Sequence, residues 1–298
     1  MLMKDRLFFF SVLLLAFCIQ TCGTVDAPKG GYLDVGKIRL YYEEMGEGLP
    51  LIMLHGGLLD RRMWDDQFQL FSKQYRVIRY DVRNHGMSRA VPDTFTHYDD
   101  LYRVMEQLGI EKAVIMGLSL GGRIAVDFAL EYPEKVSALV LAAPGLSGYN
   151  FNSPELQEVN VPMQKAFQEG NLDMGIEYFQ RGWTDGPHRE PSEVDSTIRA
   201  KVRTMAVNSA EHWNPQSRVV EQVPPAVDRL GEIQAPTLAV VGELDMPDIL
   251  DIVDRIEKSV SGAKKVIVPG VAHMVNMEKP EEFNAIVLNF LGELSLYE

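Results

Sequence analysis

One serine in this chain has surroundings that suit nucleophilic chemistry. Ser119 lies at the centre of a G-x-S-x-G motif over residues 117–121, after an apolar run (113–116) and before a helix-like stretch (120–132). A serine between a strand and a helix occupies a tight turn, and the flanking glycines are needed because side chains would collide with the neighbouring strand and helix. The motif therefore predicts a nucleophile; the alternative, a glycine-rich turn with a capping serine, is disfavoured by the strand-to-helix context.

A serine hydroxyl is a weak nucleophile at neutral pH, so it needs a base, and the base needs a partner that fixes its tautomer. Both types of residue follow apolar runs further along the chain. Asp245 comes after residues 237–241, and His273 comes after residues 266–268. The carboxyl ends of parallel strands meet at one edge of a sheet, where ligand sites collect. We therefore predict that His273 is the base and that Asp245 orients it.

The chain has six histidines, and His55 and His85 are the alternatives for the base. Neither follows the last predicted strand, so the chain order favours His273. The remaining three are expected to cap helices or to lie in an insertion: His97, His188 and His212. No pair of histidines has the spacing of a metal site such as H-E-x-x-H, so we expect neither a metal nor a cofactor.

Two other acidic residues near Asp245 are alternatives for the orienting carboxylate. Asp248 follows Pro247 at the start of an apolar-periodic run, where it suits the first turn of a helix and the helix dipole. Glu243 is the weaker alternative. Asp245 is favoured because it lies on the predicted loop ahead of that helix.

The elements that would position these residues alternate along the chain. A hairpin is predicted over residues 31–35 and 37–44, with its turn at Gly36. Short, nearly continuous apolar runs then predict strands buried on both faces of a parallel sheet, and helix-like stretches separate them, as is typical of parallel crossover units. The predicted strands span residues 51–55, 76–80, 113–116, 138–141, 236–242 and 264–268, and the predicted helices span residues 63–72, 98–108, 120–132, 247–258 and 280–291.

The pattern changes between residues 148 and 230. Asn, Pro, Glu and Gln become common, helix-like stretches remain over residues 162–169 and 196–207, and no buried strand is evident. We therefore predict that residues 31–147 and 231–298 form an α/β core and that residues 148–230 form a helical cap insertion. Trp183 and Trp213 of the insertion either line an apolar pocket or anchor the cap.

These motifs resemble the α/β-hydrolase superfamily, in its branch of small esterases, lactonases, haloperoxidase-like enzymes and carbon–carbon bond hydrolases. The resemblance covers residues 31–291, and the chain order Ser, Asp, His is that of this fold. Residues 54–57 resemble the family's oxyanion segment, and residues 81–88 resemble its D-x-R-G-x-G-x-S turn. Asn84 stands where glycine is usual in that turn, and Asn tolerates left-handed geometry.

The resemblance implies an α/β-hydrolase fold with a mostly parallel sheet of about eight strands, helices on both faces and a helical cap. It also implies an oxyanion hole formed by the backbone N–H groups of Leu120 and Gly57, with His55 and His85 holding turns beneath the site. Leu58 stands where proline iminopeptidases have a proline. A serine nucleophile, rather than aspartate, argues against the haloalkane dehalogenase and epoxide hydrolase branches.

The predicted function is hydrolysis of a carboxylic ester, or a related acyl bond, of a small molecule through an acyl-enzyme on the serine. Three alternatives stay open on the same fold. They are a carbon–carbon bond hydrolase, a lactonase, and a non-catalytic small-molecule receptor that keeps the triad.

The composition agrees with one large packed domain that carries an insertion. The chain has 298 residues, of which 46% are hydrophobic and 24% are charged. Its formal charge is -13 and it has no run of Lys or Arg, so nucleic-acid binding is not expected. The negative field also mildly disfavours highly anionic substrates, although net charge says little about one pocket.

The N-terminal segment resembles a secretory signal. Lys4 and Arg6 precede an apolar run over residues 7–19, which is short for a membrane span of about 20 residues. We predict that residues 1–22 are an export signal and that the protein is periplasmic or membrane-anchored. Both cysteines lie at the end of this segment. Three outcomes stay open: lipidation with Cys22 favoured over Cys18, cleavage near Gly23 or Ala27, and retention as a membrane anchor.

Overall fold

The computed structural model describes residues 27–89 and 91–294. The predicted export signal, residues 1–22, lies outside the described residues, as do the lipidation candidates Cys18 and Cys22. Within the described part of the chain, no helix is both long enough and apolar enough to cross a membrane.

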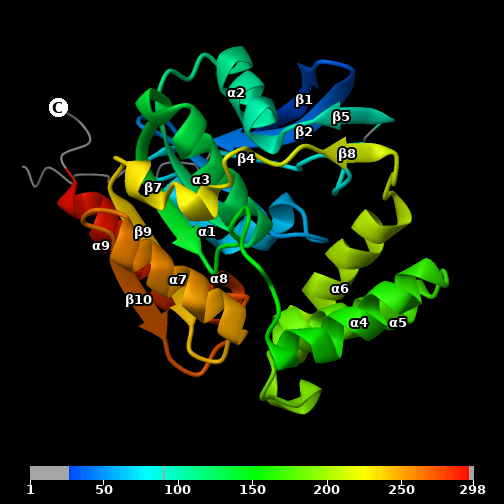
Figure 1. The fold of residues 1–298 in the computed structure, drawn as a ribbon. Coiled ribbons are helices and arrows are strands. Elements are labelled where there is room, and N and C mark those ends of the chain that lie inside the picture. Colours follow the sequence, from blue (N-terminus) through cyan, green and yellow to red (C-terminus); the bar gives the residue numbers. More distant parts are fainter. Residues whose placement is uncertain (1–26, 90, 295–298) are drawn as a thin grey trace, which may run out of the picture.

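A central sheet of eight strands runs through the molecule (Figure 1). Its strands are β1 (Lys29–Val35), β2 (Ile38–Met45), β3 (Pro50–Leu54), β4 (Arg76–Tyr80), β6 (Ala113–Leu118), β7 (Val136–Ala142), β9 (Thr237–Gly242) and β10 (Lys264–Val268). They lie in the order β1-β2-β4-β3-β6-β7-β9-β10. The pairings of β1 with β2 and of β2 with β4 are antiparallel, and the others are parallel. This architecture confirms the predicted fold class.

Helices cover both faces of the sheet, and the central strands are apolar on both faces. On one face, Ile52 and Leu54 of β3 share a core cluster with α2 (His97–Gln107), α3 (Leu120–Glu131) and α7 (Pro247–Ser259). On the other face, Leu51 and Met53 share a cluster with α1 (Asp65–Phe71) and α9 (Pro280–Glu293). Successive side chains of a strand point to opposite faces, so a strand between two helical layers needs an unbroken apolar run.

The structure contains two short strands that the sequence did not predict. β5 (Asp93–Phe95) and β8 (Ser217–Val219) pair in parallel, with Asp93 opposite Ser217 and Phe95 opposite Val219. β8 lies between residues 148 and 230, where the sequence shows no buried strand, and two of its three residues are exposed. Each strand has three residues, of which one is buried. Neither strand can produce the continuous apolar run that marks the central strands.

The segment between β7 and β9 contributes three helices that stand apart from the central sheet (Figure 1). They are α4 (Pro154–Gln168), α5 (Leu172–Gln180) and α6 (Ser196–Glu211), and a short π-helix, η3 (Arg181–Asp185), follows α5. α4 begins before the predicted start at residue 162, because Ser153 caps it by accepting the N–H of Leu156 and a proline occupies its first turn. Pro162 consequently lies inside this helix.

Candidate active site

Ser119 lies between β6 and α3 in a backbone conformation that L-residues rarely adopt, with φ 53° and ψ -109°. Two glycines make this turn sterically feasible. A Cβ on Gly117 would lie 2.2 Å from the backbone carbonyl carbon of Gly121, and a Cβ on Gly121 would lie 2.1 Å from the backbone oxygen of Leu54. The two strands and the helix approach each other too closely for side chains at these positions. Their packing therefore holds Ser119 in a strained turn.

Replacing Gly121 by alanine is expected to lower the free energy of unfolding by about 3 kcal/mol, because the new Cβ must push β3 away from α3. Urea unfolding followed by circular dichroism measures this change. Gly292→Ala in α9 is the matched control, since a Cβ at Gly292 meets no atom within 4 Å. Equal stability of the two variants would contradict the close packing around the serine turn.

Asp245 and His273 meet at the carboxyl edge of the sheet. Asp245 follows β9, His273 follows β10, and both side chains are buried. His273 Nδ1 lies 2.9 Å from Oδ2 and 3.1 Å from Oδ1 of Asp245. Oδ1 also accepts the N–H of Met246 at 2.7 Å, which fixes the carboxylate. Because an ionised carboxylate only accepts hydrogen bonds, Nδ1 carries the proton of the neutral ring and Nε2 is left as the basic nitrogen.

The two alternative carboxylates have other partners. Asp248 accepts the backbone N–H groups of Asn152 and Ser153, and so ties the start of the inserted segment to α7. Glu243 accepts the N–H of Gly270 at 2.9 Å. Of the three candidate acids, Asp245 is the one in contact with His273 among the residues that the structure describes.

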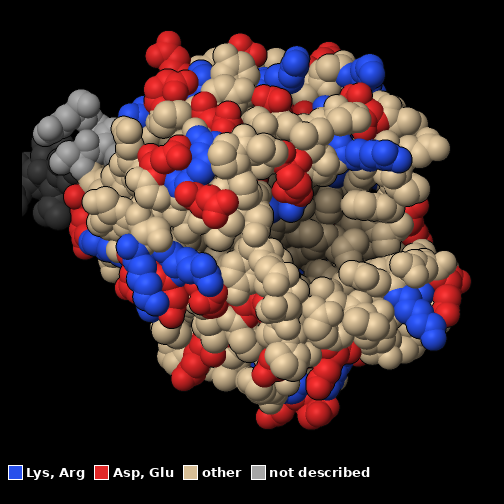
Figure 2. Space-filling model, viewed as in Figure 1, with Lys and Arg blue, Asp and Glu red and all other residues tan. Residues whose placement is uncertain are grey.

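A cavity of about 710 Å³ lies between the sheet edge and the inserted helices. Its lining includes Ser119, His273, Gly57 and Leu120. The structure thus brings four of the five predicted site residues to one cavity. It places the fifth, Asp245, within hydrogen-bonding distance of Nδ1 of His273. Figure 2 shows a hollow in this region, between the surface over β8 and the surface over α4 to α6.

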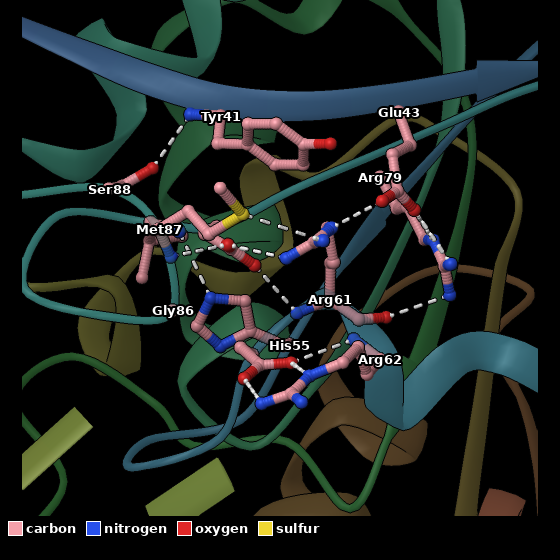
Figure 3. A network of polar contacts seen from close by, with 12 residues as sticks. Tyr41, Glu43, His55, Arg61, Arg62, Arg79, Gly86, Met87 and Ser88 are labelled. Atoms are coloured by element: carbon pink, nitrogen blue, oxygen red, sulfur yellow. Dashed lines mark hydrogen bonds and ion pairs between the residues drawn. The ribbon is translucent and has the colours of Figure 1, made fainter. Parts of the chain in front are cut away.

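The segment that carries Gly57 is tied to the neighbouring turn by a polar network (Figure 3). Asp81, which follows β4, accepts the backbone N–H of Arg61 at 2.8 Å and its guanidinium at 2.9 Å. The same carboxylate accepts the N–H of Met87 at 2.8 Å. Arg61 also donates to Glu43 of β2 at 2.8 Å. These bonds join the loop after β3 to the turn after β4 and so fix the backbone around Gly57.

The N–H of Leu120 belongs to the first turn of α3, where backbone N–H groups have no partner within the helix. It is therefore free of helical pairing and lies beside the serine turn. Gly57 lines the same cavity, and a Cβ there would meet no atom within 4 Å. The two residues predicted to form the oxyanion hole therefore line the same cavity as Ser119.

Asn84 adopts the left-handed conformation expected where this turn has asparagine in place of glycine. Its φ is 66°. Its Oδ1 accepts the N–H of Asn214 at 3.1 Å, so the turn after β4 is also bonded to the inserted segment.

His55 and His85 are buried histidines that hold backbone turns. His55 Nε2 accepts the N–H of Val82 at 3.0 Å, and His85 Nε2 accepts the N–H of Leu58 at 3.1 Å. Each Nδ1 donates to a backbone carbonyl oxygen. Burial lowers the pKa of His55 to about 4 and the pKa of His85 to about 3. Both rings are neutral with both nitrogens engaged, so neither is available as a base.

Acidification is expected to destabilise the protein below about pH 6.5, the pKa of histidine in an unfolded chain. The folded-state pKa of His55 is about 4. Between these values the unfolded chain binds more protons, so stability that is fully present above pH 6.5 is lost as the pH falls toward 4. His55 and His85 are each expected to contribute about 2 kcal/mol of this loss by pH 5.

Urea unfolding at pH 7.5 and pH 5 measures this loss, and His55→Gln isolates the contribution of one ring. The variant should lose less stability than the wild type over this interval. If both proteins lose the same amount, the decline comes from other groups and the neutral buried state of His55 is wrong.

The tryptophans of the inserted segment, Trp183 and Trp213, both line the cavity. Trp183 lies in η3, and its ring centroid is 4.6 Å from that of His273. Trp213 is 55% exposed. The pocket-lining alternative therefore holds for both residues.

Several cavity-lining residues carry no motif that identifies them in the sequence. His97, expected only to cap a helix or lie in an insertion, is the first residue of α2 and lines the cavity, as do Arg123 and Ser217. The cavity-lining position of Arg123 could have been predicted from the sequence, because Arg123 follows Ser119 by one helical turn and so lies on the same face of α3. Within the described residues, no group of three or more His, Cys, Asp or Glu side chains is placed to hold a metal ion.

Known proteins resemble this chain over most of its length. A family model described as alpha/beta hydrolase fold matches residues 50–280. The chain is 29% identical over 289 residues to a 2-hydroxy-6-oxononadienedioate/2-hydroxy-6-oxononatrienedioate hydrolase from Klebsiella pneumoniae, which covers 90% of this chain and 97% of the relative.

Two solved structures are similar to the fold. One is a hydrolase from Pseudomonas aeruginosa, with 25% sequence identity, a TM-score of 0.71, and coverage of 90% of this chain and 100% of that chain. The other is a thermophilic esterase from Thermogutta terrifontis, with 25% identity, a TM-score of 0.70, and coverage of 90% and 99%.

Proposed function

Because this chain belongs to the alpha/beta hydrolase fold family, we propose that it is a serine hydrolase that cleaves carboxylic esters of small molecules. The observation that carries the proposal is the shared cavity of Ser119 and His273, together with the buried contact between His273 and Asp245. The similarity to an esterase from Thermogutta terrifontis agrees with this class of substrate.

In the proposed reaction, the Ser119 hydroxyl attacks the ester carbonyl carbon while His273 Nε2 accepts the hydroxyl proton. The carbonyl oxygen becomes an oxyanion, which accepts hydrogen bonds from the N–H groups of Leu120 and Gly57. Each such donor can stabilise the transition state by about 3 kcal/mol. Asp245 stabilises the imidazolium through Nδ1 without taking its proton.

The tetrahedral intermediate collapses by breaking the bond to the leaving alcohol, which takes the proton from His273. Water then attacks the acyl-enzyme, and His273 accepts a proton from this water. Collapse of the second intermediate returns the proton to Ser119 and releases the carboxylic acid. The strained turn at Ser119 presents the hydroxyl at the N-terminus of α3 throughout these steps.

A carbon–carbon bond hydrolase is the second candidate, because the relative from Klebsiella pneumoniae is named a hydrolase of 2-hydroxy-6-oxononadienedioate, and a carbon–carbon bond beside the 6-oxo group is what water can cleave in such a molecule. The full-length protein is tested on p-nitrophenyl esters of increasing acyl length, on a simple lactone, and on a 2-hydroxy-6-oxo-dienoate. We expect ester hydrolysis. Cleavage of the dienoate with no ester hydrolysis would favour the second candidate, and no turnover of any substrate would favour a receptor.

A further inference from the structure

The cavity has a polar end that the proposed mechanism does not use. This basic corner consists of Arg83, His97, Arg123 and Ser217, all of which line the cavity. Arg123 lies on α3, and its N–H donates to the carbonyl oxygen of Ser119 at 2.9 Å. His97 begins α2 and Ser217 begins β8. Segments far apart in the sequence thus converge on the cavity that holds the proposed nucleophile.

The charge of the cavity wall is opposite to that of the whole chain. The chain has 42 Asp and Glu and a formal net charge of -13. The described residues that line the cavity nevertheless include two arginines, Arg83 and Arg123, and no aspartate or glutamate. Solvent screens exposed charges beyond about 8 Å, so the wall, rather than the distant surface, determines what the cavity attracts. This wall favours an anionic group.

The two arginines differ in how fully their charge is paired. Arg83 donates to both carboxylate oxygens of Asp100, at 2.6 and 2.8 Å, and both side chains are buried. Arg123 is paired with Glu221 at 3.4 Å, and the Glu221 side chain is 57% exposed. Such an exposed pair is weak and exchanges readily. Arg123 is therefore the cation that an anion in the cavity can engage.

Three polar atoms of the basic corner are buried and have no hydrogen-bond partner among the described residues. They are His97 Nδ1, Ser217 Oγ and Arg83 Nη1. The three residues are 9%, 7% and 5% exposed. Arg83 Nη1 forms an ion pair with Asp93 at 3.5 Å but no hydrogen bond. Buried polar atoms in folded proteins are almost always paired. Because all three residues line the cavity, small rotations of their side chains toward a bound ligand would give these atoms a partner.

We propose that the basic corner binds a carboxylate of the substrate, with Arg123 supplying the charge and Ser217 and His97 supplying hydrogen bonds. The proposal rests on the proposed function, because it specifies the class of ester: one that carries a carboxylate away from the scissile bond. A monoanion fits better than a phosphate dianion, since the corner offers one weakly paired cation. The apolar lining, which includes Phe151, Leu156 and Phe167, suits the carbon chain of such a molecule.

Binding is measured by calorimetric titration of full-length Ser119→Ala protein, so that the ester is not consumed. The ligands are the monomethyl esters of unbranched dicarboxylic acids from succinate to suberate, each paired with its dimethyl ester. At least one monomethyl ester is expected to bind about tenfold more tightly than its uncharged dimethyl partner, because one charge-assisted hydrogen bond contributes about that factor in affinity. No such preference at any chain length, including no measurable binding, would overturn the proposal.

Two further substitutions in the same protein locate the carboxylate. Arg123→Gln should abolish the preference, and Ser217→Ala should reduce it several-fold without lowering the melting temperature, because the hydroxyl has no partner inside the described protein. Arg218→Gln is the matched control, since Arg218 is the exposed neighbour of Ser217 on β8 and loses the same charge. A preference that survives Arg123→Gln, or that falls equally in Arg218→Gln, would refute the assignment.

Hydrolysis of p-nitrophenyl butyrate by the wild type separates this proposal from the proposed function. Hydrolysis without any preference for the monomethyl esters would remove the carboxylate subsite and leave the serine hydrolase intact. A preference in the binding experiment without hydrolysis would keep the subsite and remove the esterase activity.

Discussion

Alanine in place of Ser119 is expected to lower kcat for ester hydrolysis by a factor on the order of 10⁶, leaving the weak catalysis that binding and the oxyanion donors supply alone. The loss is this large because no acyl-enzyme can form without the hydroxyl. Hydrolysis of p-nitrophenyl butyrate measures it. Ser259→Ala, at the exposed end of α7, is the control that should keep the wild-type rate. A Ser119→Ala protein with more than a hundredth of that rate would exclude Ser119 as the nucleophile.

Two inactive variants at position 119 are expected to differ in their free energy of unfolding. Ser119→Ala keeps a Cβ in the turn with φ 53°, so its free energy of unfolding should stay close to that of the wild type. Ser119→Gly removes the Cβ and relieves backbone strain, and it should stabilise the protein by about 1 kcal/mol while remaining inactive. A glycine variant less stable than the alanine variant would mean that the turn is not strained.

Asparagine in place of Asp245 is expected to lower kcat by a factor of about 10⁴ with little change in substrate binding. An amide NH₂ can donate to Nδ1 of His273, which would place the ring proton on Nε2 and leave no basic nitrogen for the serine. Steady-state kinetics on the same ester measure the change, and a fall in kcat without a matching rise in KM is the expected signature.

Asp248→Asn is the matched control, because Asp248 lies three residues further along and bonds Asn152 and Ser153 instead of the imidazole. This substitution weakens the attachment of the inserted segment and should reduce activity far less. A larger loss in Asp248→Asn than in Asp245→Asn would reassign the orienting acid.

The central strands of the sheet, β3, β4, β6, β7 and β9, were predictable because they are buried on both faces. Residues 51–54 alternate between the two core clusters, so the chain must place apolar side chains at every position of β3. β5 and β8 have no such requirement, since each buries a single residue. α4 was only partly predictable, because Pro162 resembles a helix start in the sequence, whereas the cap that starts the helix is Ser153.

The candidate triad was predictable because Ser119, Asp245 and His273 each follow a predicted strand of a parallel sheet, so the topology alone brings them to one edge. No comparable rule predicts the basic corner from the sequence. Ser217 lies on a strand that pairs outside the main sheet, and the role of His97 depends on which way the start of α2 faces. Their common cavity follows from tertiary packing between segments with no periodic signal.

Mass spectrometry of the protein after incubation with a fluorophosphonate is the most direct test of the central claim, because this reagent forms a covalent bond with an activated serine. The expected result is one phosphonyl group per chain, carried by the peptide that contains Ser119, and almost no labelling in His273→Ala. A label on a different residue, or ester hydrolysis that continues with Ser119 unlabelled and accessible, would contradict the claim that Ser119 is the nucleophile.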